Sequence, residues 1–383
     1  MSFAHLGLSE ELEAALVKQH YQQPYPIQEQ AIPAILEGND VLGIAKTGSG
    51  KTASFVLPIL QQLQKSNTPK SRNIKVLVLV PTRELAVQVQ EVFHQFGSAL
   101  PNHIKSMAVY GGVSINPQMK ALYGTQILVA TPGRLLELVE NKAVGLSVVR
   151  ILVLDEADKM LNLGFEKEMQ QVLAKLPTQR QNLLFSATLN EQIEGIKQLL
   201  LADPVVIKIK KKAEALPDLD QIKQSAYLVT PERKGPLLRY LIKHHGWKQV
   251  LVFVSSVYSA KHVSEKLRKN GIDAEAVHSK KGQGARMFAL KQFKEGVLPV
   301  LVATDLLARG IDIEGLPHVI NYELPRSPKD YIHRIGRTGR AAATGEAISL
   351  ITEEDLHHFK VIQKKMKKQV ELLDSGEINL QGY

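Results

Sequence analysis

The segment Ala45–Thr52, which reads AKTGSGKT, combines the residue types that bind phosphate groups. It follows the apolar run Val41–Ile44, so the sequence predicts a glycine-rich turn between a strand and a helix. Such a turn directs several backbone N–H groups to one point, beside the positive end of the helix dipole. The Lys51 ammonium can then reach the β- and γ-phosphates of a nucleotide, and the Thr52 hydroxyl can ligate Mg²⁺. A purely structural turn is the alternative, because Ala45 stands where the strict pattern begins with glycine.

A group of carboxylates follows another apolar run in the same half of the chain. Ile151–Leu154 precedes Asp155-Glu156-Ala157-Asp158, at the carboxyl end of a predicted strand, where open α/β sheets bind ligands. Asp155 can hold Mg²⁺, partly through water, and Glu156 can orient and deprotonate an attacking water. Capping of the next helix is the alternative role for these acidic residues. Together with the phosphate turn, they predict that this half binds a nucleoside triphosphate.

The elements that must position these groups recur along the whole chain. Short β-branched apolar runs alternate with stretches of helical periodicity, as is typical of buried parallel strands in βαβ units. The runs form two series, so we expect an α/β protein with two doubly wound sheets. The predicted strands are Val41–Ile44, Val76–Val80, Gln126–Ala130, Ile151–Leu154 and Asn182–Phe185, followed by Val250–Val254, Val300–Ala303, Val319–Tyr322 and Ala347–Ile351.

The length of the chain also predicts two domains. Its 383 residues exceed the size of about 250–300 residues at which a single core stops growing. We expect an N-terminal domain over 1–207, a linker over 208–219 where charge and proline interrupt the periodicity, and a C-terminal domain over 220–355. A short basic helical tail is expected over 356–383. Its lysines, Lys364, Lys365, Lys367 and Lys368, form either a solvated helix face or an RNA-binding extension.

Composition restricts the partners and the compartment. The formal net charge of +10 favours polyanionic partners such as nucleic acid or an anionic membrane, without deciding between them. The chain has no cysteine, which excludes disulfides and thiolate metal sites. No apolar run approaches the roughly 20 residues needed to cross a bilayer. Met1–Glu10 lacks the pattern of a signal peptide, so we expect a cytoplasmic protein.

The motifs, taken together, match a known family. The letters DEAD at Asp155–Asp158, the phosphate turn and a series of further motifs in the same order resemble the DEAD-box ATP-dependent RNA helicases of superfamily 2, in their bacterial form. The resemblance runs from Phe3 to about Leu350. It implies two tandem RecA-like domains, each a mostly parallel sheet with helices on both faces. It also implies ATP with Mg²⁺, and RNA as the partner.

The resemblance assigns an adenine-reading segment upstream of the phosphate turn. It implies that Tyr21 stacks on the base, that Gln28 hydrogen-bonds the adenine edge, and that Phe3 packs over this segment. A Gln amide offers the donor and the acceptor that this edge requires. The chain departs from the family at His20, usually Gly, and at Tyr25, usually Thr or Ser. The predicted ATP-binding residues are Phe3, Tyr21, Gln28, Ala45, Lys46, Thr47, Gly48, Ser49, Gly50, Lys51, Thr52 and Asp312.

Several motifs resemble the family's RNA-contacting segments. Glycines in them permit close backbone approach, and their basic and hydroxyl side chains can meet phosphate oxygens. For any one of these motifs, turn formation and helix capping are an equal alternative. The implied RNA-binding residues are Arg83, Gly111, Gly112, Thr131 and Arg134 in the first domain and Gln283, Arg286 and Thr304 in the second. Val252–Ser256 resembles another strand end that faces RNA.

The second half has no phosphate turn of its own, so a second ATPase site is not expected. The resemblance implies that Arg337 and Arg340 reach the γ-phosphate, a role that suits the planar, permanently charged guanidinium. It also implies a set of residues that couple hydrolysis to RNA: Asp158, Ser186, Thr188, Asp305, Arg309 and His333. Hydroxyls of Ser186-Ala187-Thr188 are expected to bond Asp158. The predicted catalytic set is Lys51, Asp155, Glu156, Arg337 and Arg340, with Thr52 and Asp155 at the metal.

These assignments predict an RNA-stimulated ATPase whose two domains close on ATP and RNA, open short duplexes and remodel RNA–protein particles. Two alternatives stay open: an ATP-dependent clamp that holds RNA for partner proteins, and a DNA-directed motor of the same superfamily. Phosphate contacts carry no base information, so the sequence does not identify the RNA or the pathway.

Overall fold

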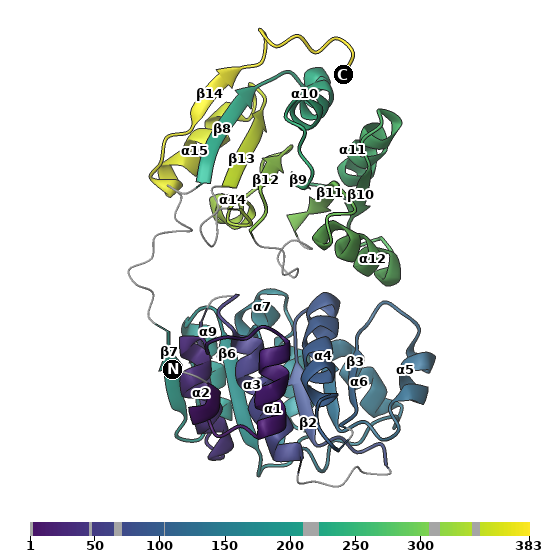
Figure 1. Ribbon diagram of the computed structural model, residues 1–383, viewed down its shortest axis with the longest axis vertical. Coiled ribbons are helices and arrows are strands. Elements are labelled where there is room, and N and C mark those ends of the chain that lie inside the picture. Colours follow the sequence, from purple (N-terminus) through teal and green to yellow (C-terminus); the bar gives the residue numbers. More distant parts are fainter. Residues whose placement is uncertain are drawn as a thin grey trace. The chain divides into compact units, whose positions relative to one another are not determined.

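The computed structural model describes residues 3–45, 48–64, 71–102, 104–209, 222–305, 315–338 and 345–383, without the side chain of Gln283. The chain forms two compact units, Met1–Lys211 and Lys212–Tyr383 (Figure 1). Each unit is built on its own parallel sheet.

The first unit has a seven-stranded parallel sheet within the described residues, in the order β3-β4-β2-β5-β6-β1-β7. Every pairing in it is parallel, which requires a crossover between successive strands and places all carboxyl ends at one edge. The strands are β1 (Val41–Ile44), β2 (Val76–Leu79), β3 (Ser106–Val109), β4 (Ile127–Ala130), β5 (Ile151–Leu154), β6 (Gln181–Ser186) and β7 (Val205–Lys208).

Helices cover both faces of this sheet (Figure 1). Side chains alternate between the faces, so Val76 and Val78 of β2 enter one core whereas Leu77 and Leu79 enter the other. The first core is covered by α1 (Glu10–Lys18), α2 (Pro26–Leu36), α3 (Lys51–Leu63) and α4 (Arg83–Gly97). The second is covered by α5 (Ile115–Ala121), α6 (Pro132–Glu140), α7 (Ala157–Asn162), α8 (Glu166–Leu173) and α9 (Glu191–Leu200). A short 3₁₀ turn, Phe3–His5, precedes α1.

The second unit repeats this topology. Its described residues also form a seven-stranded parallel sheet, in the order β10-β11-β9-β12-β13-β8-β14, which is the order of the first sheet shifted by seven strands. The strands are β8 (Ile222–Leu228), β9 (Val250–Val254), β10 (Ala274–Val277), β11 (Val300–Thr304), β12 (His318–Asn321), β13 (Gly345–Ile351) and β14 (Glu371–Asp374). One face packs on α10 (Pro231–His244) and α11 (Val257–Lys269), and the other on α12 (Gln283–Lys294), α14 (Pro328–Ile335) and α15 (Leu356–Met366).

The predicted fold class is confirmed, and the nine predicted strands match strands of the structure to within two residues. The tail differs from the expectation of a helix throughout. It begins as α15, whose Phe359, Ile362 and Met366 are buried, but then forms the edge strand β14 beside β8. Lys208, expected in the linker, is the last residue of β7, and most of the predicted linker lies outside the described residues. The domain boundaries remain predictions.

Among the described residues, none of the helices combines the length and the apolar character needed to cross a bilayer.

Candidate nucleotide and RNA sites

The phosphate turn links β1 to α3 in the first unit. Gly50 precedes the helix with φ of 85°, a left-handed conformation that glycine adopts without strain. Lys51 begins α3 and is 6% exposed, and its Nζ donates a hydrogen bond to the Ala45 carbonyl oxygen 2.6 Å away. The ammonium therefore lies across the turn that the sequence predicted to hold phosphate. Lys46 and Thr47 lie outside the described residues.

Gln28 joins the predicted adenine segment to this turn. Its Oε1 accepts a hydrogen bond from the Tyr25 backbone N–H at 2.9 Å, and its Nε2 donates to the Gly50 carbonyl oxygen at 3.1 Å. A Cβ at Gly50 would lie 2.6 Å from Gln28 Nε2, so only glycine permits this approach. The sequence did not indicate that Gln28 supports the phosphate turn. Its contact with adenine remains a prediction. The amide has a second N–H, which suits a hydrogen bond to the base.

Tyr21 belongs to a cluster of aromatic rings. Its ring meets Phe3 edge to face at 6.4 Å between centroids and Phe96 at 5.7 Å. Burial, followed by the nearby Tyr25, raises the pKa of the Tyr21 hydroxyl. Phe3 packs against Tyr21, as expected, whereas stacking of Tyr21 on a base remains a prediction.

Asp155 lies directly after β5, at the carboxyl edge of the sheet. It is 2% exposed, and its Oδ1 accepts a hydrogen bond from the Glu156 backbone N–H at 2.9 Å. Burial raises the pKa of this carboxyl group to about 6, against an opposing effect of the Lys51 charge. The site thus holds a buried carboxylate that the ammonium groups of Lys51 and Lys159 neutralise only in part. Such a group is stabilised by an additional cation.

Glu156 is held in an unusual backbone conformation. Its φ of 53° and ψ of 45° are left-handed, which costs a side chain with a Cβ on the order of 1–3 kcal/mol. The carboxylate is 7% exposed and forms an ion pair with Lys159, with 2.7 Å between Oε1 and Nζ. Strain of this kind concentrates at functional sites, and here it occurs at the predicted general base.

The residues around the turn fit a magnesium ion. Within the described part of the chain there is no group of three or more His, Asp or Glu side chains that could hold a metal alone. Mg²⁺ commonly binds through one or two carboxylates and keeps its remaining positions for water and substrate phosphates. The buried Asp155 carboxylate and the Thr52 hydroxyl near the phosphate turn supply hard oxygen donors of this kind.

The third acidic residue of the DEAD segment makes the contact that was expected of it. Asp158 Oδ2 accepts a hydrogen bond from Thr188 Oγ1 at 3.1 Å, which joins α7 to the segment after β6. The Ser186 hydroxyl instead donates to the Thr188 carbonyl oxygen at 2.8 Å. The predicted bond from this motif to Asp158 is therefore confirmed for Thr188 and not for Ser186. The role of these residues in coupling remains a prediction.

Arg83 and Gly112 lie against each other at the same edge. Gly112 has φ of 76°, and a Cβ there would lie 2.0 Å from Arg83 Nη2, so a larger residue would displace the guanidinium. Gln118 holds this loop, because its amide accepts from the Tyr110 N–H at 3.0 Å and donates to the Tyr110 and Ser114 carbonyl oxygens. Gln118 belongs to no local motif, so the sequence did not indicate it.

Arg134 is more buried than a simple phosphate contact would require. It is 6% exposed, its Nη2 donates to the Val113 carbonyl oxygen at 2.8 Å, and its Nε pairs with Glu137 at 2.8 Å. Its Nη1 is buried without a hydrogen-bond partner among the described residues. Arg134 therefore positions the loop that contains Gly111 and Gly112. Thr131, 8% exposed, immediately precedes α6.

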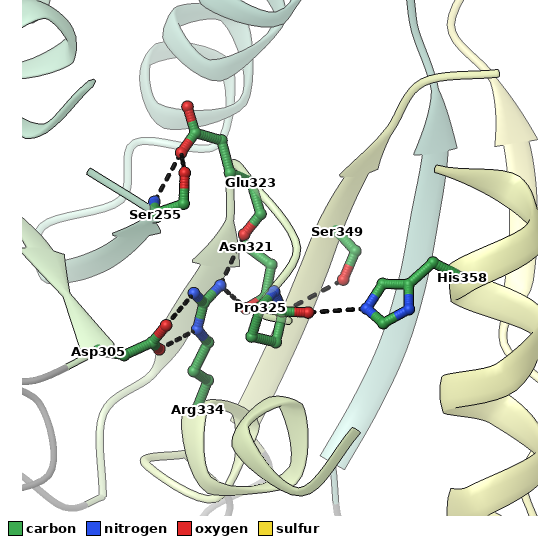
Figure 2. Close-up of polar contacts among 8 residues, drawn as sticks. All are labelled: Ser255, Asp305, Asn321, Glu323, Pro325, Arg334, Ser349 and His358. Carbon is green, nitrogen blue, oxygen red and sulfur yellow. Dashed lines mark hydrogen bonds and ion pairs between the residues drawn. The ribbon is translucent and has the colours of Figure 1, made fainter. Parts of the chain in front are cut away.

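In the second unit, Arg334 is the centre of a polar network (Figure 2). Its Nε and Nη2 pair with the two carboxylate oxygens of Asp305 at 2.5 and 2.7 Å. Its Nη1 donates to Asn321 Oδ1 at 3.2 Å and to the Glu323 carbonyl oxygen at 2.6 Å. The side chain of Glu323 accepts from the Ser255 N–H at 2.6 Å and from the Ser255 hydroxyl. Arg334 thereby fixes the carboxyl ends of β9, β11 and β12.

The sequence placed Arg334 in a motif but gave it no role. The signal that was available is its position in the His333–Arg340 segment, next to a predicted strand. Asp305, predicted as a coupling residue, is the carboxylate partner of Arg334.

The other predicted residues of the second unit are only partly described. Thr304 ends β11, Arg286 is 4% exposed on α12, His333 is exposed on α14, and Arg337 is half-buried after that helix. Residues outside the description are Arg309, Asp312 and Arg340, together with the side chain of Gln283. The structure thus brings Lys51, Asp155 and Glu156 together in the first unit. The nucleotide and RNA roles predicted for the second unit remain predictions.

Comparison with known proteins agrees with this geometry. The family model described as DEAD/DEAH box helicase matches residues 25–196, and that described as Helicase conserved C-terminal domain matches residues 233–342. The chain is 38% identical over 375 residues to the ATP-dependent RNA helicase CshA of Listeria monocytogenes, with 97% of this chain and 70% of the relative covered. It is 37% identical to the DEAD-box ATP-dependent RNA helicase CshA of Geobacillus kaustophilus, with 97% and 78% covered.

A solved structure is similar over nearly the whole chain. It is that of S. cerevisiae Dbp5 bound to RNA and ADP BeF3, with a TM-score of 0.80 and 30% sequence identity. The alignment covers 98% of this chain and 96% of the yeast chain.

Proposed function

This chain belongs to the DEAD/DEAH box helicases, and from that membership we propose that it hydrolyses ATP in response to RNA and opens short RNA duplexes. It is an ATP-dependent RNA helicase of the bacterial type. Two observations support RNA as its partner. Relatives named RNA helicases match almost the full chain, and a similar yeast protein was solved bound to RNA and ADP BeF3. Remodelling of RNA–protein particles follows from the same cycle.

The observation that carries the proposal is the cluster of Lys51, Asp155 and Glu156 at one edge of the first sheet. We assign Lys51 to the terminal phosphates, since its ammonium lies across the phosphate turn on a carbonyl oxygen. Glu156 is assigned to orienting and deprotonating the attacking water, because its backbone is strained and its carboxylate is buried beside Asp155. Phosphoryl transfer depends mainly on positioning and charge stabilisation, which this arrangement supplies.

Asp155 and Thr52 are proposed to hold Mg²⁺, partly through water. When bound, the ion neutralises charge on the phosphates during transfer. Asp155 offers a buried carboxylate that lacks full neutralisation, and Thr52 offers a hydroxyl in the first turn of α3. The Ala45–Thr52 turn, with Phe3, Tyr21, Gln28 and Asp312, is proposed to hold the rest of the nucleotide.

Arg337 and Arg340 are proposed to stabilise the charge on the transferred phosphoryl group. A guanidinium suits this task because it is planar and permanently charged. Asp158, Ser186, Thr188, Asp305, Arg309 and His333 are proposed to couple hydrolysis to RNA. The hydrogen bond from Thr188 to Asp158 and the paired Asp305 and Arg334 support this assignment within each unit.

RNA is proposed to bind through its phosphates and sugars rather than its base edges. Arg83, Gly111, Gly112, Thr131, Gln283, Arg286 and Thr304 are the proposed contacts. Arg134 is proposed to act on RNA through the Gly111–Val113 loop that it holds. We also propose a cytoplasmic location, in keeping with a bacterial RNA helicase and a chain without cysteine.

The decisive experiment measures ATP turnover with RNA and with DNA of the same sequence. RNA should stimulate turnover, and DNA should not, because the 2′-hydroxyl is the group that distinguishes RNA along a backbone. Equal stimulation by DNA would replace the RNA helicase by a DNA-directed motor. Comparing the rate of ATP turnover with the lifetime of bound RNA separates a helicase from an ATP-dependent clamp. In a clamp, the RNA stays bound for much longer than the time that a helicase needs for one turnover.

A further inference from the structure

Tyr258 presents an aromatic ring to solvent in the first turn of α11. Its exposed fraction is 76%, and no large apolar side chain in the described part of the chain is more exposed. The ring lies nearly parallel to that of His262, one helical turn later, at 5.9 Å between centroids and 9° between planes. The helix therefore carries a stacked pair of rings on its exposed side.

This surface lies at the edge of the sheet proposed to meet RNA. Thr304, a proposed phosphate contact at the end of β11, is in register with Val254 at the end of β9. Ser255 and Ser256 follow Val254, and α11 begins at Val257 with Ser256 as its cap. Since parallel strands end at the same edge, Tyr258 stands four residues beyond the neighbour of Thr304.

Positive charge surrounds this part of the edge. Burial lowers the pKa of His278, the residue after β10, and Lys261, Lys281 and Lys280 lower it further in that order. All three ammonium groups act on one imidazole, and that of Lys281 is also paired with Glu275, which leaves Lys261 and Lys280 as the cations of this surface. Lys261 is exposed on α11, one turn after Tyr258, and Lys280 is exposed in the loop before α12. A polyanion is the partner that such a group of cations attracts.

A ring that served only to stabilise α11 would not need this exposure. An i,i+4 ring pair contributes about 0.2–0.5 kcal/mol to a helix, whether or not its outer face is open. Single exposed apolar residues are common on protein surfaces, so exposure alone decides nothing. The combination of an uncovered ring pair, adjacent cations and a neighbouring phosphate contact is the arrangement that single-stranded nucleic acid binding uses.

We propose that Tyr258, supported by His262, stacks on one nucleobase of the bound RNA strand. The proposal rests on the proposed function, because it requires RNA to run along the edge that holds Thr304. It adds one base contact to a set that otherwise meets only phosphates and sugars. Stacking tolerates any base, since every base has a π face, so the contact strengthens binding without fixing a sequence.

The test combines variants of Tyr258 with RNA decamers that lack one base. Binding is measured with the full chain and a non-hydrolysable ATP analogue, for the intact decamer and for decamers with a single abasic nucleotide at each position. For the wild type, one abasic position should weaken affinity by about fivefold or more, the lower end of base–aromatic stacking. Tyr258→Ala should weaken binding of the intact RNA by a similar factor. The variant should bind the decamer that is abasic at that position as well as it binds the intact decamer.

Two further variants separate stacking from a structural effect. Tyr258→Phe keeps the ring and should bind both RNAs as the wild type does. Phe288→Ala removes another exposed ring, 62% exposed on α12 and roughly 200° around that helix from Arg286. It should leave the abasic scan unchanged.

The proposal is overturned if Tyr258→Ala binds every decamer as the wild type does, or if its effect adds to the abasic effect at every position. The first of these outcomes would assign the exposed ring to another kind of interface. RNA-stimulated ATP turnover of the wild type is measured alongside. If RNA does not stimulate ATP turnover, the proposed function fails. If RNA stimulates turnover but the effect of Tyr258→Ala is the same for every abasic decamer, only the stacking contact is overturned.

Discussion

The two units share one strand order but differ at the crossover that follows the first strand in each. In the first unit, β1 leads through the glycine-rich turn to α3, and Gly50 adopts a left-handed conformation. The corresponding strand of the second unit, β8, leads through Thr230 in an extended conformation to Pro231, which begins α10. Proline has no N–H, so the second crossover lacks a donor at the position where a helix binds phosphate.

A buried lysine occurs near the start of both helices, with different partners. Lys51 of α3 donates to a backbone carbonyl oxygen at 2.6 Å. Lys234 of α10 donates to the Tyr322 carbonyl oxygen at 3.2 Å and forms an ion pair with Asp355 at 3.5 Å. Burial lowers the pKa of Lys234, and Asp355 opposes that effect. The second unit therefore provides an internal carboxylate for its lysine, where the first leaves the lysine able to meet a substrate phosphate.

The same contrast holds for carboxylates at the strand ends. Asp305 of the second unit is matched by a bidentate Arg334, whereas Asp155 of the first is buried with a raised pKa. One sheet topology thus carries the proposed ligand site in the first unit and a closed internal network in the second. The proposed ligand site of the first unit therefore contains a buried carboxylate that the protein itself leaves incompletely neutralised.

The largest effect is expected at Glu156. Glu156→Gln keeps the size of the side chain but removes the base, so ATP turnover should fall by about 10²–10⁴ while ATP binding is retained. Lys51→Ala should instead weaken ATP binding, because it removes a phosphate contact. Equilibrium binding of a fluorescent ATP analogue and steady-state turnover separate the two. Equal loss of ATP binding in both variants would contradict the assigned roles.

Arg334 on α14 and Arg337 just after this helix should also differ in what their substitution affects. Arg337→Lys should cut RNA-stimulated turnover at least about tenfold, since lysine lacks the fixed donors of an arginine finger. RNA affinity and thermal stability should change little. Arg334→Met should instead lower the free energy of unfolding by about 3–5 kcal/mol, because it removes the cation that pairs with Asp305. Turnover of Arg337→Lys within twofold of the wild type would remove Arg337 from the site.

The incompletely neutralised carboxylate should destabilise the first unit when nucleotide and Mg²⁺ are absent. Because the pKa of Asp155 rises from 3.8 to about 6 on folding, the folded protein binds more protons than the unfolded chain between these values. Its stability therefore decreases as the pH rises through that window, and the full penalty is present above about pH 6. Asp155→Asn should raise the free energy of unfolding by about 1–3 kcal/mol near neutral pH, and by less near pH 5.

Asp158 provides the control for this experiment. Its carboxylate accepts a hydrogen bond from Thr188, so Asp158→Asn should not stabilise the protein at either pH. Denaturant titrations in buffer without nucleotide measure both variants. An Asp155→Asn variant that is no more stable than the wild type near neutral pH would show that the carboxylate is already neutralised.

The smallest effect is expected at Lys234. Lys234→Met should lower the free energy of unfolding by about 1–2 kcal/mol, because it leaves Asp355 and the Tyr322 carbonyl oxygen without a charged donor. ATP binding should stay within about twofold of the wild type, as the residue lies outside the proposed sites. Lys51→Met should show the opposite pattern, with ATP binding lost and stability less affected. If both variants lost ATP binding, the two lysines would not differ as proposed.

Local pattern predicted the fold class well. The boundaries of β1, β5 and β9 match the predicted runs to the residue, because central strands of a parallel sheet are buried on both faces and consist of continuous apolar residues. The strands that were not predicted, β3, β7, β8, β10 and β14, include polar or exposed positions. In β7, for example, only Ile207 is buried. Within these strands the apolar runs are at most three residues long, too short to distinguish them from loops.

The sequence alone predicted a phosphate turn, the DEAD carboxylates and their place at strand ends, since each is a contiguous segment with its own chemistry. Only the tertiary structure decided which groups are paired. Arg334 meets Asp305 across 29 residues of sequence, and Gln28 meets Gly50 across 22. Neither contact has a local signature. Burial likewise depends on the whole fold, so the left-handed Glu156 and the raised pKa of Asp155 arise from the packed sheet edge rather than from the residues around them.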